Sequence, residues 1–384
     1  MSNFTLFFNG FTKDQWGKDP FLVPYNLGKE LGCEEVNIVR FPSGDENDST
    51  NEHDGVRLIT LPKAHKNAIK PTIRLIPYFK YLWRNARNID YLMLFFNSIE
   101  SRMLAVLYKT LNTHGKCYIK MDINPRKVDD VPNTTKGPRG LKNKWIDELG
   151  KRNVDVISCE SKIAFNALRN SRKRWNQWGK KLVYMPNGFD ETLCQQLQIR
   201  EKSFLEKENL MITVGRLGTP PKNTSMLLNA LGKVDMKDWR AVLIGPIQDS
   251  FKPVIEKFYA KHPNKKDKII FTGPIYDKKE LWEWYNRSKV FLLSSKWESF
   301  ALVFVESQRF SNFIISTPVG AAEDVIEGEK YGRIVPLDDV EVMSHKIQEI
   351  IDGETNIDVF QNFDKQSLSW EHRVKVVAEK LRKS

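Results

Sequence analysis

Short apolar runs alternate with longer amphipathic stretches along nearly the whole of this chain. In the first half the apolar runs predict strands at residues 5–9, 35–41, 56–61, 91–97, 116–122 and 154–159. The stretches between them place apolar residues at helical spacing and predict helices at residues 21–31, 77–87, 100–111, 142–151 and 161–175. Such alternation is typical of a parallel sheet covered by helices on both faces, so we expect an α/β domain.

A second alternating series follows residues 186–190. Its strands are expected at residues 210–214, 240–244, 268–272, 290–293, 313–316 and 333–336. Its helices are expected at residues 225–231, 251–261, 279–287, 301–310 and 340–352. A polar stretch, residues 191–208, leads into this series, and residues 369–381 predict a terminal helix with one apolar face. The pattern favours two α/β domains of similar size.

Composition excludes several classes of protein. Of the 384 residues, 41% are hydrophobic and 28% are charged, as in globular proteins rather than disordered chains or fibres. The longest apolar runs are far shorter than the ~20 residues of a membrane span, and the first residues lack the pattern of a signal peptide. The four cysteines form no CxxC pair, which excludes a disulfide framework or zinc ribbon and fits a reducing cytoplasm.

The formal net charge of +12 is concentrated in one third of the chain. Residues 63–181 hold 26 lysines and arginines against 9 acidic residues, a balance of +17, which leaves the remainder at −5. Within this region, residues 77–87 and 169–181 interleave aromatic side chains with cations. Such segments suit the headgroup layer of an anionic membrane. Solvated charges around an aromatic core would give the same pattern, and the surface could also bind an anionic glycan. A basic surface can bind nucleic acid as well, but we do not expect this, because the sequence has no recognition motif and the second domain is mildly acidic.

Two carboxylates eight residues apart, Glu298 and Glu306, flank an apolar run in the second series. A helix that begins near Phe300 would leave its first backbone N–H groups free, beyond the end of the preceding strand. Free N–H groups of this kind are a natural site for a phosphate or a sugar hydroxyl. For this pair alone, the alternative is a capped helix with one surface carboxylate.

Two further strand-to-helix turns carry suitable residues. In one, Gly215 lets the backbone pass close to a ligand, and Arg216 and Lys222 supply cations that can neutralise a diphosphate as it leaves. In the other, Gly320 stands at the tight point. Each turn alone is common, but three such turns at the carboxyl ends of strands in one α/β domain predict a ligand crevice.

The order and spacing of these motifs resemble glycosyltransferase family 4. The motifs are Pro-Asn-Gly-Phe-Asp (186–190), Gly-Arg-Leu with Lys-Asn (215–217, 222–223), Phe-Thr-Gly (271–273), Glu-x7-Glu (298–306) and Thr-Pro-Val-Gly (317–320). The resemblance covers residues 186–364 nearly throughout. It implies the GT-B fold, in which two Rossmann-like parallel-sheet domains face each other across a cleft and a C-terminal helix crosses back to the first domain. Residues 1–187 with 365–384 would then bind the acceptor, and residues 188–364 the nucleotide-sugar donor.

The resemblance also implies roles for single residues. Arg216 and Lys222 hold the donor diphosphate, Glu306 hydrogen-bonds the ribose hydroxyls, and Glu298 hydrogen-bonds the transferred sugar. Other residues meet the donor chiefly through their backbone: Gly215, Ser299, Phe300, Ala301 and Leu302 near the sugar and phosphates, and Gly273, Pro274 and Ile275 near the base.

The chain departs from the family in two places. The family often has glycine where Ala301 stands, a mild change if only backbone amides are used. It also commonly has a sugar-contacting histidine after a mid-domain strand, where this chain has Lys120-Met121-Asp122. Asp122 either replaces that histidine as a hydroxyl acceptor or caps the following loop. Gly10 either lets the backbone of the first turn approach the ligand or is simply a turn glycine.

We therefore expect a retaining glycosyltransferase that moves a sugar from a UDP-sugar or GDP-sugar to a saccharide acceptor, expected to be lipid-linked, in cell-surface glycan synthesis. No Asp-x-Asp motif is present, so we expect no metal and no other cofactor, and the two cations neutralise the leaving group in a front-face reaction. The enzyme is expected in the cytoplasm, peripheral on the inner face of the cell membrane. The alternatives are a nucleotide-sugar epimerase or hydrolase of the same fold and a basic nucleic-acid-binding protein.

Overall fold

A computed structural model describes residues 2–42, 51–62, 75–124, 128, 138–173 and 176–384. The chain forms two compact units, Met1–Gly188 with Trp370–Ser384, and Phe189–Ser369. The last fifteen residues therefore fold with the first unit.

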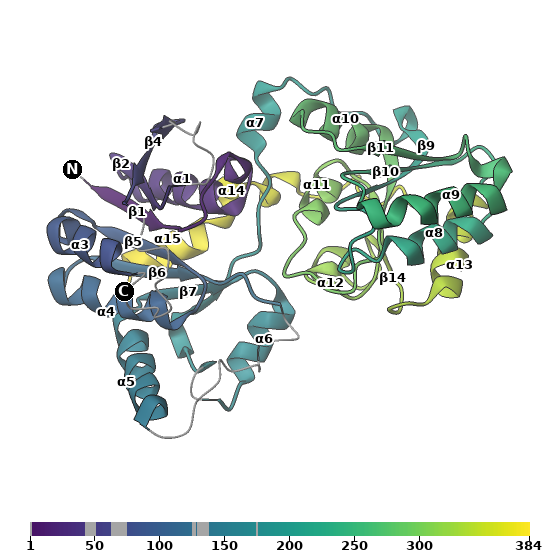
Figure 1. Ribbon diagram of the computed structural model, residues 1–384. Coiled ribbons are helices and arrows are strands. Elements are labelled where there is room, and N and C mark those ends of the chain that lie inside the picture. The colour runs from purple at the N-terminus through teal and green to yellow at the C-terminus, as the bar shows by residue number, and fades with distance from the viewer. Residues whose placement is uncertain (1, 43–50, 63–74, 125–127, 129–137, 174–175) are drawn as a thin grey trace. The chain divides into compact units, whose positions relative to one another are not determined.

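The first unit is built on a sheet whose described strands all pair in parallel, except that β3 runs antiparallel to β4. In the described residues the strand order is β3-β4-β2-β1-β5-β6-β7-β8. The strands from β4 to β7 are labelled in Figure 1. The strands are β1 (Asn3–Phe7), β2 (Glu35–Arg40), β3 (Glu52–His53), β4 (Val56–Thr60), β5 (Tyr91–Phe95), β6 (Lys116–Lys120), β7 (Val156–Cys159) and β8 (Leu182–Tyr184). Side chains alternate across the sheet, so Phe4 and Leu6 of β1 enter one core and Phe7 enters the other.

Helices cover both faces of this sheet. One core is shared by α1 (Asp19–Leu31), α14 (Trp370–Arg373) and α15 (Lys375–Arg382). The other is shared by α3 (Ile76–Asn85), α4 (Ile99–Leu111) and α6 (Lys162–Asn170), and α5 (Pro138–Asn153) packs on α4. The predicted terminal helix is two helices that meet at Val374. Its apolar face is buried as expected: Trp370, Val374, Val377 and Leu381.

The second unit has a parallel sheet in the order β11-β10-β9-β12-β13-β14. Its strands are β9 (Glu208–Val214), β10 (Arg240–Ile244), β11 (Ile269–Gly273), β12 (Ser288–Leu293), β13 (Phe313–Ser316) and β14 (Gly332–Ile334). One face packs on α8 (Thr224–Lys233), α9 (Lys252–Lys261) and α13 (Val340–Ile351). The other packs on α7 (Glu191–Gln196), α10 (Lys278–Arg287), α11 (Val303–Arg309) and α12 (Ala322–Ile326).

The sequence pattern predicts these elements with few errors. The expected strands are present with small shifts at their ends, and the alternation of strands with helices is confirmed. The two strands that were missed, β3 and β8, are only two and three residues long. Helix α7, of six residues, was also missed, because it lies in the stretch 191–208 that was expected to be a polar connection. The helix expected at residues 161–175 ends at Asn170, because Ser171 takes extended backbone angles.

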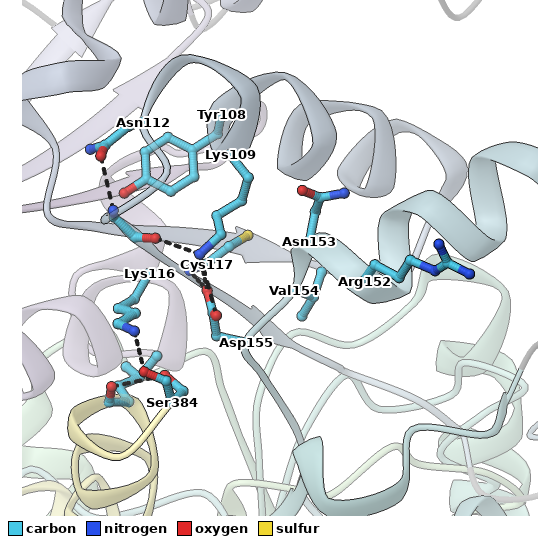
Figure 2. Close-up of polar contacts among 12 residues, drawn as sticks. Tyr108, Lys109, Asn112, Lys116, Cys117, Arg152, Asn153, Val154, Asp155 and Ser384 are labelled. Carbon is cyan, nitrogen blue, oxygen red and sulfur yellow. Dashed lines mark hydrogen bonds and ion pairs between the residues drawn. The ribbon is translucent and has the colours of Figure 1, made fainter.

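The amino-terminal edge of the first sheet is fixed by polar contacts (Figure 2). Asp155 accepts hydrogen bonds from Lys109 of α4 (3.1 Å) and from the amide of Cys117 in β6 (2.7 Å). Lys116 donates to the carbonyl of Ser384, which ties the C-terminal segment to β6. These contacts lie at the edge opposite to the carboxyl ends of the strands, so we assign them to stability.

Candidate functional site

The carboxyl ends of β9 and β12 lie side by side in the middle of the second sheet. From β9 the chain proceeds to β10 and β11 on one side, and then to β12, β13 and β14 on the other. The strand order therefore reverses between β9 and β12, which is where open α/β sheets bind ligands. The turns that carry Arg216 and Glu298 follow these two strands.

Hydrogen bonds join the three turns predicted to form the crevice. The amide of Lys296, after β12, donates to the carbonyl of Pro221, after β9 (2.7 Å). Thr317 Oγ1, after β13, donates to the carbonyl of Ser295 (2.6 Å). The three turns thus form one connected structure at this edge of the sheet.

Lys222 and Glu298 form an ion pair at the centre of this structure. Lys222 Nζ donates to Glu298 Oε1 at 2.6 Å, and Ser295 Oγ donates to the same oxygen at 2.7 Å. The side chains of Lys222 and Glu298 are 17% and 16% exposed. A Cβ at Gly215 would lie 3.2 Å from Lys222 Cε, so the glycine leaves room for the lysine stem.

Arg216 differs from Lys222 in its surroundings. Its side chain is exposed, and within the described residues its guanidinium makes no ion pair. Arg216 can therefore bind an anion without breaking an ion pair, whereas Lys222 must first give up its ion pair with Glu298. In the part of the chain that the structure describes, no three His, Cys, Asp or Glu side chains are placed to hold a metal ion.

The segment from Phe300 to Leu302 precedes α11, which begins at Val303. In the described residues, the amides of Phe300, Ala301 and Leu302 donate no hydrogen bond to the backbone. Ala301 has a φ of 72°, in the left-handed region where a Cβ is unfavourable. Alanine in place of the family's glycine therefore carries backbone strain. That the change is mild for a role that uses only backbone amides stays a prediction.

Gly320 supports this segment from the turn after β13. Its φ is 55°, and a Cβ there would lie 2.6 Å from the carbonyl oxygen of Phe300. The same carbonyl accepts a hydrogen bond from the amide of Ala321 at 3.1 Å. Space therefore requires glycine at position 320, and the backbone angle favours it.

Glu306 lies inside α11, with its side chain 13% exposed. Its Oε1 accepts hydrogen bonds from Lys278 Nζ (2.6 Å) and from Trp282 Nε1 (3.0 Å), both on α10. Helix α10 follows residues 273–275, in which Gly273 has a φ of 77°. The structure thus links Glu306, through α10, to the loop predicted to contact the base.

In the first unit, Gly10 lines a pocket of about 290 Å³ at the carboxyl ends of β1 and β5. The strand order of this sheet also reverses between these two strands. The aromatic residues of the lining are Phe7, Phe8, Tyr78, Phe95 and Phe96. Phe96 is 47% exposed and has a φ of 62°, and such backbone strain in a bulky residue concentrates at functional sites. A Cβ at Gly10 would meet no atom within 4 Å, so packing does not require glycine there.

Asp122 is exposed just beyond β6 and lies next to buried charges that the sequence pattern does not reveal. Lys120 is 1% exposed, and its Nζ lies 2.6 Å from Asp19 Oδ2 and 3.1 Å from Glu160 Oε2. The available signals were a lysine directly after the apolar run 117–119 and a glutamate directly after another strand. Because the three partners come from three distant segments, their contact could not be read from spacing.

The first basic segment is exposed on one face of α3 and the turn that follows it. This face consists of Ile76, Lys80, Trp83, Arg84 and Arg87. Trp83 is 75% exposed, and Trp145 of α5 is 70% exposed. Among the described residues, no helix combines the length and apolar character of a membrane span.

In its described residues, 169–173 and 176–181, the second basic segment presents no amphipathic face. Trp178 is buried, and the Arg102 guanidinium lies 4.9 Å from the centre of its ring. Lys181 donates to the carbonyls of Lys151 and Val154, at and after the end of α5. The expectation of a membrane-facing tryptophan is therefore wrong for Trp178, while Arg174 and Trp175 lie outside the described residues.

Residues 195–367 match the family model described as glycosyl transferases group 1. An uncharacterized 41.2 kDa protein in the cps region of Klebsiella pneumoniae is 29% identical over 213 residues, which are 55% of each chain. The amylovoran biosynthesis glycosyltransferase AmsD of Erwinia amylovora is 25% identical over 153 residues, 39% of this chain and 41% of AmsD. The chain thus spans about half the length, or less, of these curated relatives.

Solved structures are similar along the whole chain. HepE of Anabaena, in complex with UDP, superposes with a TM-score of 0.61 at 14% identity, over 99% of this chain and 95% of HepE. The lipopolysaccharide outer core galactosyltransferase WaaB, in its apo form, superposes with a TM-score of 0.69 at 13% identity, over 100% of this chain and 99% of WaaB. The two parallel sheets and these neighbours show that the chain has the GT-B fold, as its sequence predicts.

Proposed function

We propose that this protein is a retaining glycosyltransferase of the family 4 type, which moves a sugar from a nucleotide-sugar to a saccharide acceptor in cell-surface polysaccharide synthesis. The observation that carries this proposal is the Lys222–Glu298 ion pair beside the reversal point of the second sheet. Glu306 follows eight residues later, within the segment that matches the glycosyl transferase model. Cations and carboxylates in one place suit a donor that carries a diphosphate next to sugar hydroxyls.

In the proposed donor complex, Arg216 and Lys222 hold the diphosphate, and Glu298 exchanges Lys222 for hydroxyls of the transferred sugar. Glu306 offers Oε2 to the ribose, because its Oε1 already accepts from Lys278 and Trp282. The base lies against the backbone of residues 273–275. HepE was solved with UDP, so UDP-sugars are the first donors to test, followed by GDP-sugars.

The proposed chemistry is a front-face substitution that needs no metal. The leaving diphosphate accepts the proton of the acceptor hydroxyl, while the two cations and the amides of residues 300–302 stabilise its developing charge. Ser299 leads into this amide segment. If this proposal is right, a chelator leaves the transfer rate unchanged, and a rate restored only by added divalent metal contradicts it.

The acceptor is proposed to bind the first unit at the aromatic pocket that Gly10 lines. Aromatic side chains offer flat apolar faces, which suit the C–H faces of a pyranose ring. The exposed carboxylate of Asp122 lies beyond β6, which pairs with β5. Asp122 is therefore proposed to accept a hydrogen bond from the acceptor hydroxyl.

The acceptor is further proposed to be lipid-linked, with the protein peripheral on the cytoplasmic face of an anionic membrane. The exposed face of α3 combines three cations with Ile76 and Trp83, and α5 adds Trp145. Amphipathic tryptophans and cations suit the headgroup layer, where each cation contributes about 1 kcal/mol.

Donor-dependent release of nucleoside diphosphate, stimulated by an added acceptor, tests the proposed activity. A thermal-shift panel of nucleotide-sugars selects the donor, because a bound ligand raises the apparent stability. Release without any dependence on acceptor would favour a hydrolase instead. Donor isomerisation without release would favour an epimerase, and retention on polynucleotide without release would favour a nucleic-acid-binding protein.

A further inference from the structure

Lys120 is the centre of a buried ionic cluster at the carboxyl edge of the first sheet. It ends β6 and is 1% exposed. Its Nζ lies 2.6 Å from Asp19 Oδ2, at the start of α1, and 3.1 Å from Glu160 Oε2, just after β7. The cluster therefore joins three elements that converge on the strand end from which Asp122 projects.

The two carboxyl oxygens of Glu160 differ in their hydrogen bonds. Its Oε2 accepts from Lys120 and from Asn187 Nδ2 (3.0 Å). Its Oε1 is buried and receives no hydrogen bond from the described residues. The carboxyl group of Asp122 lies within hydrogen-bonding reach of Glu160. Two carboxyl groups form a hydrogen bond only when one of them carries a proton.

The surroundings place this proton on Glu160 rather than on Asp122. Glu160 is 1% exposed, whereas Asp122 is open to solvent. Burial raises the pKa of Glu160 to about 8; Lys120 lowers it, and Asp122 and Asp19 raise it further. For Lys120, burial lowers the pKa, but the charge and hydrogen bond of Asp19 and the nearby charge of Asp122 raise it above its ordinary value, so Lys120 stays charged while Glu160 is neutral.

We propose that Glu160 is a positioning residue of the acceptor site, whose protonated carboxyl group donates a hydrogen bond to Asp122 and holds that carboxylate ready for an acceptor hydroxyl. Lys120 and Asn187 fix the other oxygen of Glu160, so its O–H is directed at Asp122. When Glu160 ionises, the hydrogen bond is replaced by repulsion between two carboxylates, and Asp122 loses its fixed position. This inference rests on the proposed function, because it takes the first unit as the acceptor site.

The variant Glu160→Gln tests the inference because its side-chain amide reproduces the protonated carboxyl group at every pH. Its oxygen can accept from Lys120 and Asn187 while its NH₂ donates to Asp122. For a pKa of about 8, the protonated fraction of wild-type Glu160 falls about tenfold between pH 7 and pH 9. The acceptor KM of the wild type should rise by about that factor with kcat nearly unchanged, and the KM of Glu160→Gln should stay level.

The matched control is Glu30→Gln, which makes the same chemical change at a surface ion pair with Arg382 in the same unit. It should keep the alkaline rise of the wild type. An equal rise in Glu160→Gln overturns the proposal. A Glu160→Gln variant whose KM at pH 7 already equals that of the wild type at pH 9 also overturns it, because the amide would then fail to replace the proton.

A second measurement requires no turnover. Folded Glu160 keeps its proton to about pH 8, whereas in the unfolded chain it ionises near 4.5. The proton therefore stabilises the fold fully below pH 4.5, and this stabilisation is lost as the pH rises to 8. Across this window, the unfolding equilibrium constant of the wild type should rise relative to Glu160→Gln by up to about tenfold per pH unit.

The unfolding experiment separates two failures. If no donor and acceptor react but the two proteins differ in pH dependence, the proposed function fails and the proton on Glu160 is supported. If they share one pH dependence, the inference fails whatever the activity. Should Glu160→Gln not fold, Asp122→Asn serves instead, because its amide donates to ionised Glu160 and should also flatten the pH dependence; an unchanged dependence overturns the inference.

Discussion

Lys222 Nζ lies 2.6 Å from Glu298 Oε1, so a cation from the turn after β9 is neutralised by a carboxylate from the turn after β12. In the proposed reaction each of these groups must take a new partner: the lysine a phosphate and the glutamate a sugar hydroxyl. The ion pair therefore holds both side chains in place, and each charge is neutralised by the other until a new partner binds. Arg216 has no such partner within the described residues and is expected to meet the diphosphate first.

Replacement of either cation should reduce transfer by about 10²- to 10³-fold, because each removes one electrostatic contact to the leaving group. The two variants should differ in stability. Lys222→Ala leaves the largely buried Glu298 without its cation and should cost about 1–3 kcal/mol, whereas Arg216→Ala, at an exposed position, should unfold like the wild type. Nucleoside diphosphate release and thermal unfolding measure the two effects. Turnover near that of the wild type in either variant contradicts the assignment of that cation.

Gly320→Ala should destabilise the second unit and impair transfer together. Its φ is 55°, which costs a residue with a Cβ about 1–2 kcal/mol, and the new Cβ would meet the Phe300 carbonyl at 2.6 Å. The matched control is Gly353→Ala, where φ is 78° but a Cβ meets no atom within 4 Å. The control should lose stability only. If both variants keep full activity, the turn after β13 does not support the donor site.

Ala301→Gly should stabilise the second unit by about 1 kcal/mol, because glycine removes most of the left-handed strain at a φ of 72°. For a unit of this size the melting temperature should rise by about 2–4 °C. Transfer should be retained, since the proposed role of this segment uses backbone amides. A lower melting temperature would show that the Ala301 methyl group contributes packing that outweighs the strain.

Trp83→Ala combined with Trp145→Ala should weaken binding to anionic vesicles in a flotation assay. Both side chains are more than two-thirds exposed, so their loss should leave the melting temperature unchanged. Tyr276→Ala is the control, because Tyr276 is 89% exposed in the second unit, away from the basic region of the sequence. Equal flotation of all three proteins, or flotation that ignores anionic lipid, would reject the membrane proposal.

Periodicity predicts most of the fold because nearly all elements of both units are buried on at least one side. The strand Lys116–Lys120 shows the limit: its apolar residues locate the strand, but nothing local tells that Lys120 is buried between Asp19 and Glu160. Trp178 shows the same limit for an aromatic residue. Its charged neighbours in the sequence predicted an exposed side chain, but Trp178 is buried, and the guanidinium of Arg102, 76 positions earlier, lies over its ring. The donor motifs could be placed because each follows a strand directly. Contacts between distant segments, such as Lys222 with Glu298, required the structure.

The position of α14 and α15 in the first unit affects when that unit can be completed during translation of the chain. Trp370, Val374, Val377 and Leu381 complete the core that also contains Phe4 and Phe21, yet they are translated after the whole of the second unit. The second unit is one continuous stretch of chain and can close as soon as it leaves the ribosome. The first unit is begun earlier, but this core can be completed only once residues 370–384 have been made. Its last contacts therefore form after the whole of the second unit has been translated.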